Sequence, residues 1–247
     1  MTSELSPDLF DLNRLISEGW KLYRRNFRSV MTVVLLVSIP VNAALSILSA
    51  YFIHGQGPYD AWITRLLSSA KILVFNGLIA MAVSRIVESS TKGVQIGCSS
   101  SFRHALARWG AALSLGPLLA LFAIGLLLLM LVPRLGEAVY YALFMFYFLA
   151  VSLRGSSGMA AIDYSRRLFA GRFGQVFWCQ FVFFLFSAAF TAAMLPMLLV
   201  FPRTPAVAVA FNAILDLFLA YPVTMSTLFF LNLETSSGSP DKGMAGT

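Results

Sequence analysis

Long apolar runs alternate with short polar connections along the chain. A membrane-spanning helix needs about 20 mainly apolar residues, and five of the runs reach that length. A sixth run is shorter but rich in Tyr and Phe, which suit helix packing and membrane interfaces. The six runs are Val30 to Ile53, Ile63 to Val87, Ala111 to Val132, Ala138 to Leu153, Gln175 to Phe201 and Ala206 to Leu233.

The runs are continuously apolar and do not alternate in polarity, so they predict helices and not the strands of a membrane barrel. Three connections are short: His54 to Trp62, Pro133 to Glu137 and Pro202 to Pro205. Such connections predict antiparallel hairpins. We therefore expect an all-α protein, a polytopic membrane helical bundle with six transmembrane helices. Residues 1–29 would form a cytoplasmic amphipathic segment, residues 30–233 the six-helix transmembrane domain, and residues 234–247 a disordered cytoplasmic tail.

Three segments that precede or overlap the start of apolar runs are similar to one another. They cover Ile16 to Val30, Cys98 to Ala112 and Ile162 to Val176. In the first and last copies Lys21 aligns with Arg167, and Phe27 aligns with Phe173. The shared pattern predicts three amphipathic interfacial entry helices and a pseudo-threefold repeat. Two interpretations of the first copy stay open: a helix lying flat in the interface, or a positively charged flank that only anchors the next span.

Composition and charge support a membrane protein and set its orientation. With 58% apolar and 12% charged residues, a chain of 247 residues has too little polar surface for a water-soluble globule. Basic connections are retained in the cytoplasm. Thirteen Lys and Arg lie on one predicted side, against Arg65, Arg134 and Arg203 on the other. Both termini should be cytoplasmic, in a multi-pass protein of a bacterial inner membrane.

The net charge of +7 lies in short clusters between apolar runs, not in a separate polar domain. This distribution favours anionic lipid headgroups over nucleic acid as the partner, and a membrane protein partner is a second option. The candidate headgroup contacts are Lys21, Arg24, Arg25, Arg103, Arg166, Arg167 and Arg172.

Two short stretches carry a family resemblance. Leu15 to Phe27, LISEGWKLYRRNF, resembles the opening of the membrane domain attached to some glycerophosphoryl diester phosphodiesterases and shared with stand-alone six-span proteins of unknown role. Ser165 to Phe173 is similar to a later signature of that family, which often has a glutamate ahead of it where this chain has Asp163. After Glu234 only a short Ser- and Gly-rich tail follows. The resemblance therefore implies the helical membrane domain without the phosphodiesterase domain.

Polar residues inside apolar runs are functional candidates because they are costly in lipid. Lys71 and Asp216 lie at matching depths, roughly 12 to 15 Å from the outer surface at the helical rise per residue, with Asn76 and Asn212 beside them. We expect an ion pair within a polar pocket between the second and sixth helices. The alternatives are a pair that only fixes packing, or a lysine that extends outward while Asp216 is protonated or capped by its neighbours. Kinks that build a site or improve packing are expected at Pro40, Pro117, Pro196 and Pro222.

Catalytic chemistry is not expected. His54 and His104 have no acids or cysteines at ligand spacing, and no cluster of acids or histidines is expected at the interface. Cys98 and Cys179 are far apart and are interpreted as structural thiols. We predict no catalytic residue, metal or cofactor, and no enzyme. The expected function is a lipid- or partner-interacting membrane module; the alternative is a small transporter or channel subunit.

Overall fold

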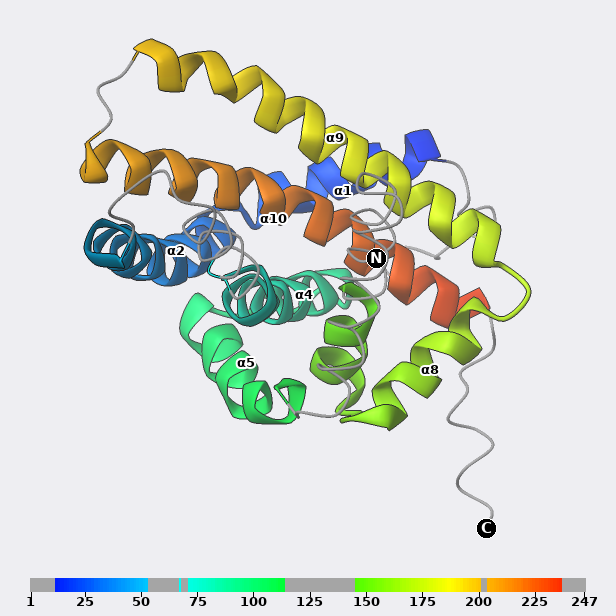
Figure 1. Cartoon of the computed structure of the whole chain (residues 1–247). Helices are drawn as coiled ribbons and strands as arrows, with labels where there is room; N and C mark the ends of the chain where they lie inside the picture. The colour runs from blue at the N-terminus through cyan, green and yellow to red at the C-terminus, as the bar shows by residue number, and fades with distance from the viewer. Residues whose placement is uncertain (1–11, 53–66, 68–70, 114–144, 201–203, 237–247) are drawn as a thin grey trace.

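The computed structural model describes residues 12–52, 67, 71–113, 145–200 and 204–236, and within these ranges it contains helices and turns but no strand (Figure 1). The expected all-α class is confirmed. In chain order the elements are α1 (Leu12–Arg25), α2 (Phe27–Phe52), the π-helix η1 (Lys71–Asn76), α4 (Gly77–Thr91), α5 (Cys98–Ala112), the π-helix η2 (Ala150–Arg154), α8 (Met159–Phe169), α9 (Phe173–Val200) and α10 (Pro205–Ser236).

Three described helices are long and apolar enough to cross a membrane. They are Phe27–Leu48, Gly174–Met194 and Pro205–Ser236. A fourth candidate is the pair Met145–Arg154 and Met159–Leu168, whose two parts are bent by 105° at the break between them. These segments overlap the first, fifth, sixth and fourth predicted runs. The six-span bundle and the repeat stay predictions, because most of the third run and the beginning of the second lie outside the described residues.

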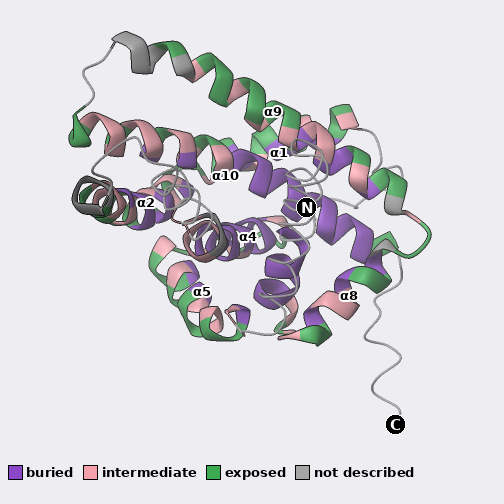
Figure 2. Ribbon diagram, viewed as in Figure 1, coloured by how far each residue is buried: buried purple, intermediate pink, exposed green. Residues whose placement is uncertain are grey.

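The long helix α10 is central to the bundle. In Figure 1 it runs between α9 on one side and α2 and α4 on the other, and it contacts all three. Its residues from Ala220 to Glu234 are buried without interruption, as the purple ribbon in Figure 2 shows. A helix that is apolar and buried all round is typical of the centre of a bundle. By contrast, α9 exposes Trp178, Leu185 and Phe186, an apolar surface suited to lipid.

The three segments predicted as entry helices are helical, as α1, α5 and α8. The break between α1 and α2 falls at Asn26, whose side-chain amide donates to the Leu22 carbonyl at 2.9 Å and to the Ser90 hydroxyl at 3.0 Å. Between α8 and α9 the chain turns at Gly171, which has a φ of +78°. Short breaks with their own hydrogen bonds thus separate α1 and α8 from the helices that follow.

The helix α1 is packed onto α10 and is not a free flank. Its residues Leu15, Gly19 and Tyr23 are buried, and the absence of a side chain at Gly19 leaves room for Met225 of α10, whose Cγ would lie 2.8 Å from a Cβ at that position. Burial raises the pKa of Tyr23 to about 12, so the hydroxyl stays protonated and able to donate. The packing of α1 on α10 is compatible with both interpretations of this segment, a helix lying in the interface and a positively charged flank that anchors the next span.

Several boundaries differ from those expected. The helix α2 begins at Phe27, three residues before Val30, and α5 continues to Ala112, inside the predicted third run. The helix α10 continues to Ser236, so residues 234–236 of the predicted tail are helical. The end of α10 has partners within the bundle, because Arg154 and Tyr164 contact Glu234 and Arg172 contacts Ser236. Pro40, Pro196 and Pro222 lie inside α2, α9 and α10, and Pro117 lies outside the described residues.

Candidate functional site

The expected partners Lys71 and Asp216 form an ion pair in the structure. Lys71 is the first residue of η1, and Asp216 lies in the middle of α10. The Lys71 Nζ atom lies 3.1 Å from Asp216 Oδ1 and 3.0 Å from Oδ2. The two side chains are 16% and 4% exposed. Because an isolated carboxylate is costly away from water, this contact couples η1 to α10.

Two residues of α2 complete the surroundings of the Asp216 carboxylate. The Ser38 hydroxyl donates to Asp216 Oδ2, and the Asn42 amide donates to the same oxygen at 3.1 Å and to Ser38 Oγ at 2.9 Å. Sequence reasoning did not include either residue. The available signal was their spacing, since two polar residues four apart in an apolar run lie on one helix face. The site therefore joins three elements: α2, η1 and α10.

The two predicted asparagines take different positions. The Asn212 amide donates to the Ala208 carbonyl at 3.0 Å, one turn earlier in α10. Asn212 was expected to lie beside Asp216, but Ser38 and Asn42 contact Asp216 instead. Asn76 ends η1, and its buried Oδ1 atom has no hydrogen-bond partner among the described residues. Of the four residues predicted to share a site, Lys71 and Asp216 are in contact and Asn76 is close by.

A cavity of about 70 Å³ lies between α4 and α10 beside this site. Asn76 and Asp216 provide its polar lining, and the remaining lining residues are Gly77, Ile79, Ala80, Met145, Phe148, Leu219, Ala220 and Val223. A cavity of this size is large enough for a few water molecules, which need polar partners to be held in place. Asn76 Oδ1 and the Asp216 carboxylate are the two groups available for that.

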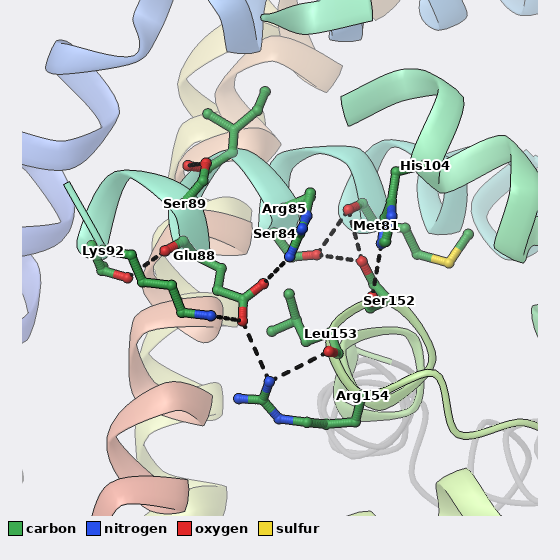
Figure 3. Close-up of polar contacts among 12 residues, drawn as sticks. Met81, Ser84, Arg85, Glu88, Ser89, Lys92, His104, Ser152, Leu153 and Arg154 are labelled. Carbon is green, nitrogen blue, oxygen red and sulfur yellow. Dashed lines mark hydrogen bonds and ion pairs between the residues drawn. The ribbon is translucent and has the colours of Figure 1, made fainter. Parts of the chain in front are cut away.

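A second cluster of charges gathers around Arg154 (Figure 3). The Glu88 side chain is 2% exposed and accepts hydrogen bonds from Arg85 at 2.7 Å, Lys92 at 2.8 Å and Arg154 at 3.3 Å. Arg154 Nε donates to Glu234 at 2.6 Å, and Nη2 contacts the same carboxylate. The Tyr164 hydroxyl also donates to Glu234. The network connects α4, η2, α8 and α10.

This network corrects the expectation that acids are not clustered. Glu88 and Glu234 share Arg154, although they are 66 and 80 residues from it in sequence. Contacts between residues so far apart in the sequence leave no local pattern. In the sequence, Arg85 and Arg154 contribute only to the count of basic residues that predicts the orientation of the chain in the membrane. Groups of three or more His, Cys, Asp or Glu able to hold a metal ion are absent from the part of the chain that the structure describes.

The charge state of Glu88 follows from its partners. Burial by itself would raise the pKa of its carboxyl group, but hydrogen bonds from Lys92 and Arg85, with the positive charges of Lys92 and Arg154, outweigh burial and lower the pKa. Glu88 is therefore ionised at neutral pH. Its carboxylate is held by cationic donors, which is typical of a structural network that joins helix ends.

His104 and Arg108 of α5 contact the end of η2 (Figure 3 shows His104). His104 Nε2 lies 3.0 Å from the Ser152 carbonyl oxygen, to which Arg108 donates at 2.6 Å. The Ser152 hydroxyl donates to the Met81 carbonyl at 2.9 Å. The helix stops at Gly155, where φ is +70°, and these donors satisfy the carbonyl groups left free at its end. His104 thus has a structural role in the bundle.

The candidate headgroup contacts are mostly on the surface. Lys21, Arg24, Arg25, Arg103, Arg166 and Arg167 are exposed. Arg172 is partly buried and donates to the Ser236 hydroxyl, so it also holds the end of α10.

The fold and these sites define the class of the protein as an all-α protein with helices that can span a membrane. Comparison with protein-family models, curated proteins and solved structures found no match for the chain. The resemblance to the glycerophosphoryl diester phosphodiesterase membrane domain stays an expectation from two short stretches. The function proposed below is therefore based on the contacts, burial and charges of the described residues.

Proposed function

We propose that this protein is a non-enzymatic module of a bacterial inner membrane, with both termini in the cytoplasm, that binds anionic phospholipid headgroups through α1, α5 and α8. The proposal rests mainly on α1. This helix combines exposed cations and an exposed tryptophan with a face that is held in the bundle.

Hydrogen bonds and packing keep α1 in a fixed orientation. The Tyr23 hydroxyl donates to the Leu217 carbonyl, and the Tyr221 hydroxyl donates to the Ile16 carbonyl, both at 3.0 Å. The ring of Trp20 packs edge-on against Tyr221 with centroids 5.5 Å apart, yet Trp20 is 49% exposed. Tryptophan beside lysine and arginine is typical of a helix at the membrane interface.

The helix α8 offers a similar arrangement. Ala161, Ser165 and Leu168 are buried, whereas Arg166 and Arg167 are exposed. Each cation close to an anionic surface contributes about 1 kcal/mol to binding. Two cations on each of two fixed helices therefore support a clear preference for anionic over zwitterionic lipid.

Charge reversal tests the proposal. A variant carrying Arg24→Glu, Arg25→Glu, Arg166→Glu and Arg167→Glu is reconstituted beside the wild type, and the association of spin-labelled phosphatidylglycerol is compared with that of spin-labelled phosphatidylcholine. We expect the wild type to prefer phosphatidylglycerol, with a preference that weakens as salt is added. The variant should lose most of this preference.

A variant with lysine at the same four positions is the matched control, since it keeps the charge and should keep the preference. If the reversed-charge variant selects phosphatidylglycerol as strongly as the wild type, the proposed function is wrong.

A second candidate function, a small transporter or channel subunit, is favoured by one observation. The buried Oδ1 atom of Asn76 lines the 70 Å³ cavity together with Asp216 and lacks a hydrogen-bond partner among the described residues. Unpaired polar groups at a cavity are typical of sites that bind water or solute. In this interpretation the Lys71–Asp216 pair would be exchanged for contacts with the transported species.

Accessibility to water tests the second function. Asn76→Cys is made in a Cys98→Ser, Cys179→Ser background and treated with a membrane-impermeant thiosulfonate. The control is Ala82→Cys in the same background, because Ala82 is a fully buried residue of α4. A transport pathway predicts that Asn76→Cys reacts and Ala82→Cys does not. Equal protection of both thiols would contradict transport through this cavity.

A further inference from the structure

A second hollow lies on the other side of α2, away from Asp216. It has a volume of about 280 Å³ and lies between the first part of α2 and the helix α5. Its lining residues are Thr32, Val33, Leu36, Cys98, Ser99, Phe102, Arg103 and Leu106, none of which lines the cavity beside Asp216.

The hollow is amphipathic. Of its apolar lining residues, Val33 is 1% exposed, whereas Leu36 and Leu106 are 55% and 43% exposed. Arg103 is exposed and Ser99 provides a hydroxyl next to it. Arg28 is also exposed and lies one turn before Thr32 in α2. In the described ranges neither Arg28 nor Arg103 forms an ion pair.

This chemistry matches a phospholipid and matches a water-soluble anion poorly. The lining helix α2 contains the candidate span Phe27–Leu48, so Leu36 and the exposed Ile39 are suited to hydrocarbon. A phosphate needs cationic donors. Arg103 of the lining is one such donor, and Arg28, which lies outside the lining one turn before Thr32, is a second cation without a carboxylate partner among the described residues. An inorganic phosphate would leave the apolar side chains of Leu36 and Leu106 uncovered, whereas the acyl chain of a phospholipid would cover them.

We infer that the hollow between α2 and α5 binds one anionic phospholipid of the cytoplasmic leaflet, with an acyl chain along Val33, Leu36 and Leu106 and the phosphate at Arg103 and Arg28. The inference rests on the proposed function, and it adds a discrete site to the general attraction of the basic helices. Arg103 thereby receives a specific role as a headgroup contact.

Cys98 serves as a reporter because it lines the hollow and is partly exposed, whereas Cys179 is buried. In a Cys179→Ser background, the rate of reaction of Cys98 with uncharged N-ethylmaleimide is measured in phosphatidylcholine bilayers with and without phosphatidylglycerol. We expect phosphatidylglycerol to slow the reaction several-fold. Ser100→Cys in a Cys98→Ser, Cys179→Ser background, at an exposed position of α5 outside the lining, should react equally in both bilayers.

Two further variants make the test specific. Arg103→Gln, at an exposed position, should abolish the protection by phosphatidylglycerol without affecting folding. Leu36→Trp should fill the hollow and slow the reaction of Cys98 even without phosphatidylglycerol. If Cys98 reacts at the same rate in both bilayers, or if Arg103→Gln keeps full protection, the inference is wrong.

The outcomes for the site and for the proposed function can be told apart. The reversed-charge variant at positions 24, 25, 166 and 167 leaves the lining of the hollow intact, so it should lose the general preference for phosphatidylglycerol but keep the protection of Cys98. A preference in the wild type without protection of Cys98 overturns the site alone. Protection of Cys98 without any general preference overturns the proposed function alone.

Discussion

At the scale of single residues, the buried acids of the described residues are paired with cations of other helices. Asp216, Glu88 and Glu234 are the buried acids of the described residues, and each lies against a lysine or an arginine. Taking one partner from such a pair leaves an uncompensated charge and costs several kcal/mol. These pairs connect η1 to α10 and join α4, η2 and α10.

Removing the charge of Glu88 should change stability in a pH-dependent way. The pKa of Glu88 is lowered in the folded state, so its contribution is present above the ordinary glutamate pKa of about 4.3 and is lost as the pH falls through the folded pKa. We expect Glu88→Gln to unfold at a lower temperature than the wild type at pH 7 in detergent. The difference should shrink as the pH falls below about 4.

The comparison isolates Glu88 because every other titrating group is common to both proteins. Arg85, Lys92 and Arg154, which contact Glu88, keep their charge over this range. A difference in unfolding temperature that stays constant from neutral to acidic pH would contradict this prediction.

At the scale of elements, helix packing depends on small residues at points of close approach. Gly77 begins α4, and a Cβ at this position would lie 2.6 Å from Phe148 Cε1. Membrane helices approach closely where a glycine removes the side chain. The apolar pattern predicted a helix here, but it did not indicate which residue of another helix would fill the space. The aromatic residues of the fourth run are suited to helix packing and to interfaces, and Phe146, Tyr147 and Phe148 are buried in the bundle.

A methyl group at position 77 should destabilise the bundle. Gly77→Ala forces the Phe148 ring to move, and overpacking of this kind costs about 1–3 kcal/mol. Thermal unfolding in detergent measures the loss. Combining Gly77→Ala with Phe148→Leu should recover part of it, because the smaller side chain makes room for the methyl group. The close packing would be disproved if Gly77→Ala had the same stability as the wild type.

At the scale of the whole molecule, α10 connects the two polar sites. Asp216 lies in its middle with Lys71, Ser38 and Asn42, and Glu234 lies near its end with Arg154. Between the two sites, the residues from Ala220 to Leu233 are buried. The helix α10 packs against α2 and α4 and is joined to η1 by the Lys71–Asp216 pair, so a change at either end of α10 alters the packing of these elements.

Orientation in the membrane is a prediction for the whole molecule. Thirteen cationic residues on the predicted cytoplasmic side, against three on the other, predict that both termini stay inside. An epitope tag at either end should be reached by an impermeant reagent in inverted vesicles and not in intact cells. Labelling of either tag from outside intact cells would overturn the orientation and the assignment of the basic helices to the cytoplasmic leaflet.

The sequence by itself determined the helical class and, to within a few residues, the positions of α2, α9 and α10. It also offered Lys71 and Asp216 as possible partners, because apolar length and depth can be judged one segment at a time. Tertiary structure alone decided that Ser38 and Asn42 join Asp216 and that Asn212 does not. It also decided that Glu88 and Glu234 share Arg154, and that α2 and α5 enclose a hollow at Arg103. The physical reason is that these contacts depend on the rotation of each helix about its axis, and that rotation is set by packing between segments far apart in the chain.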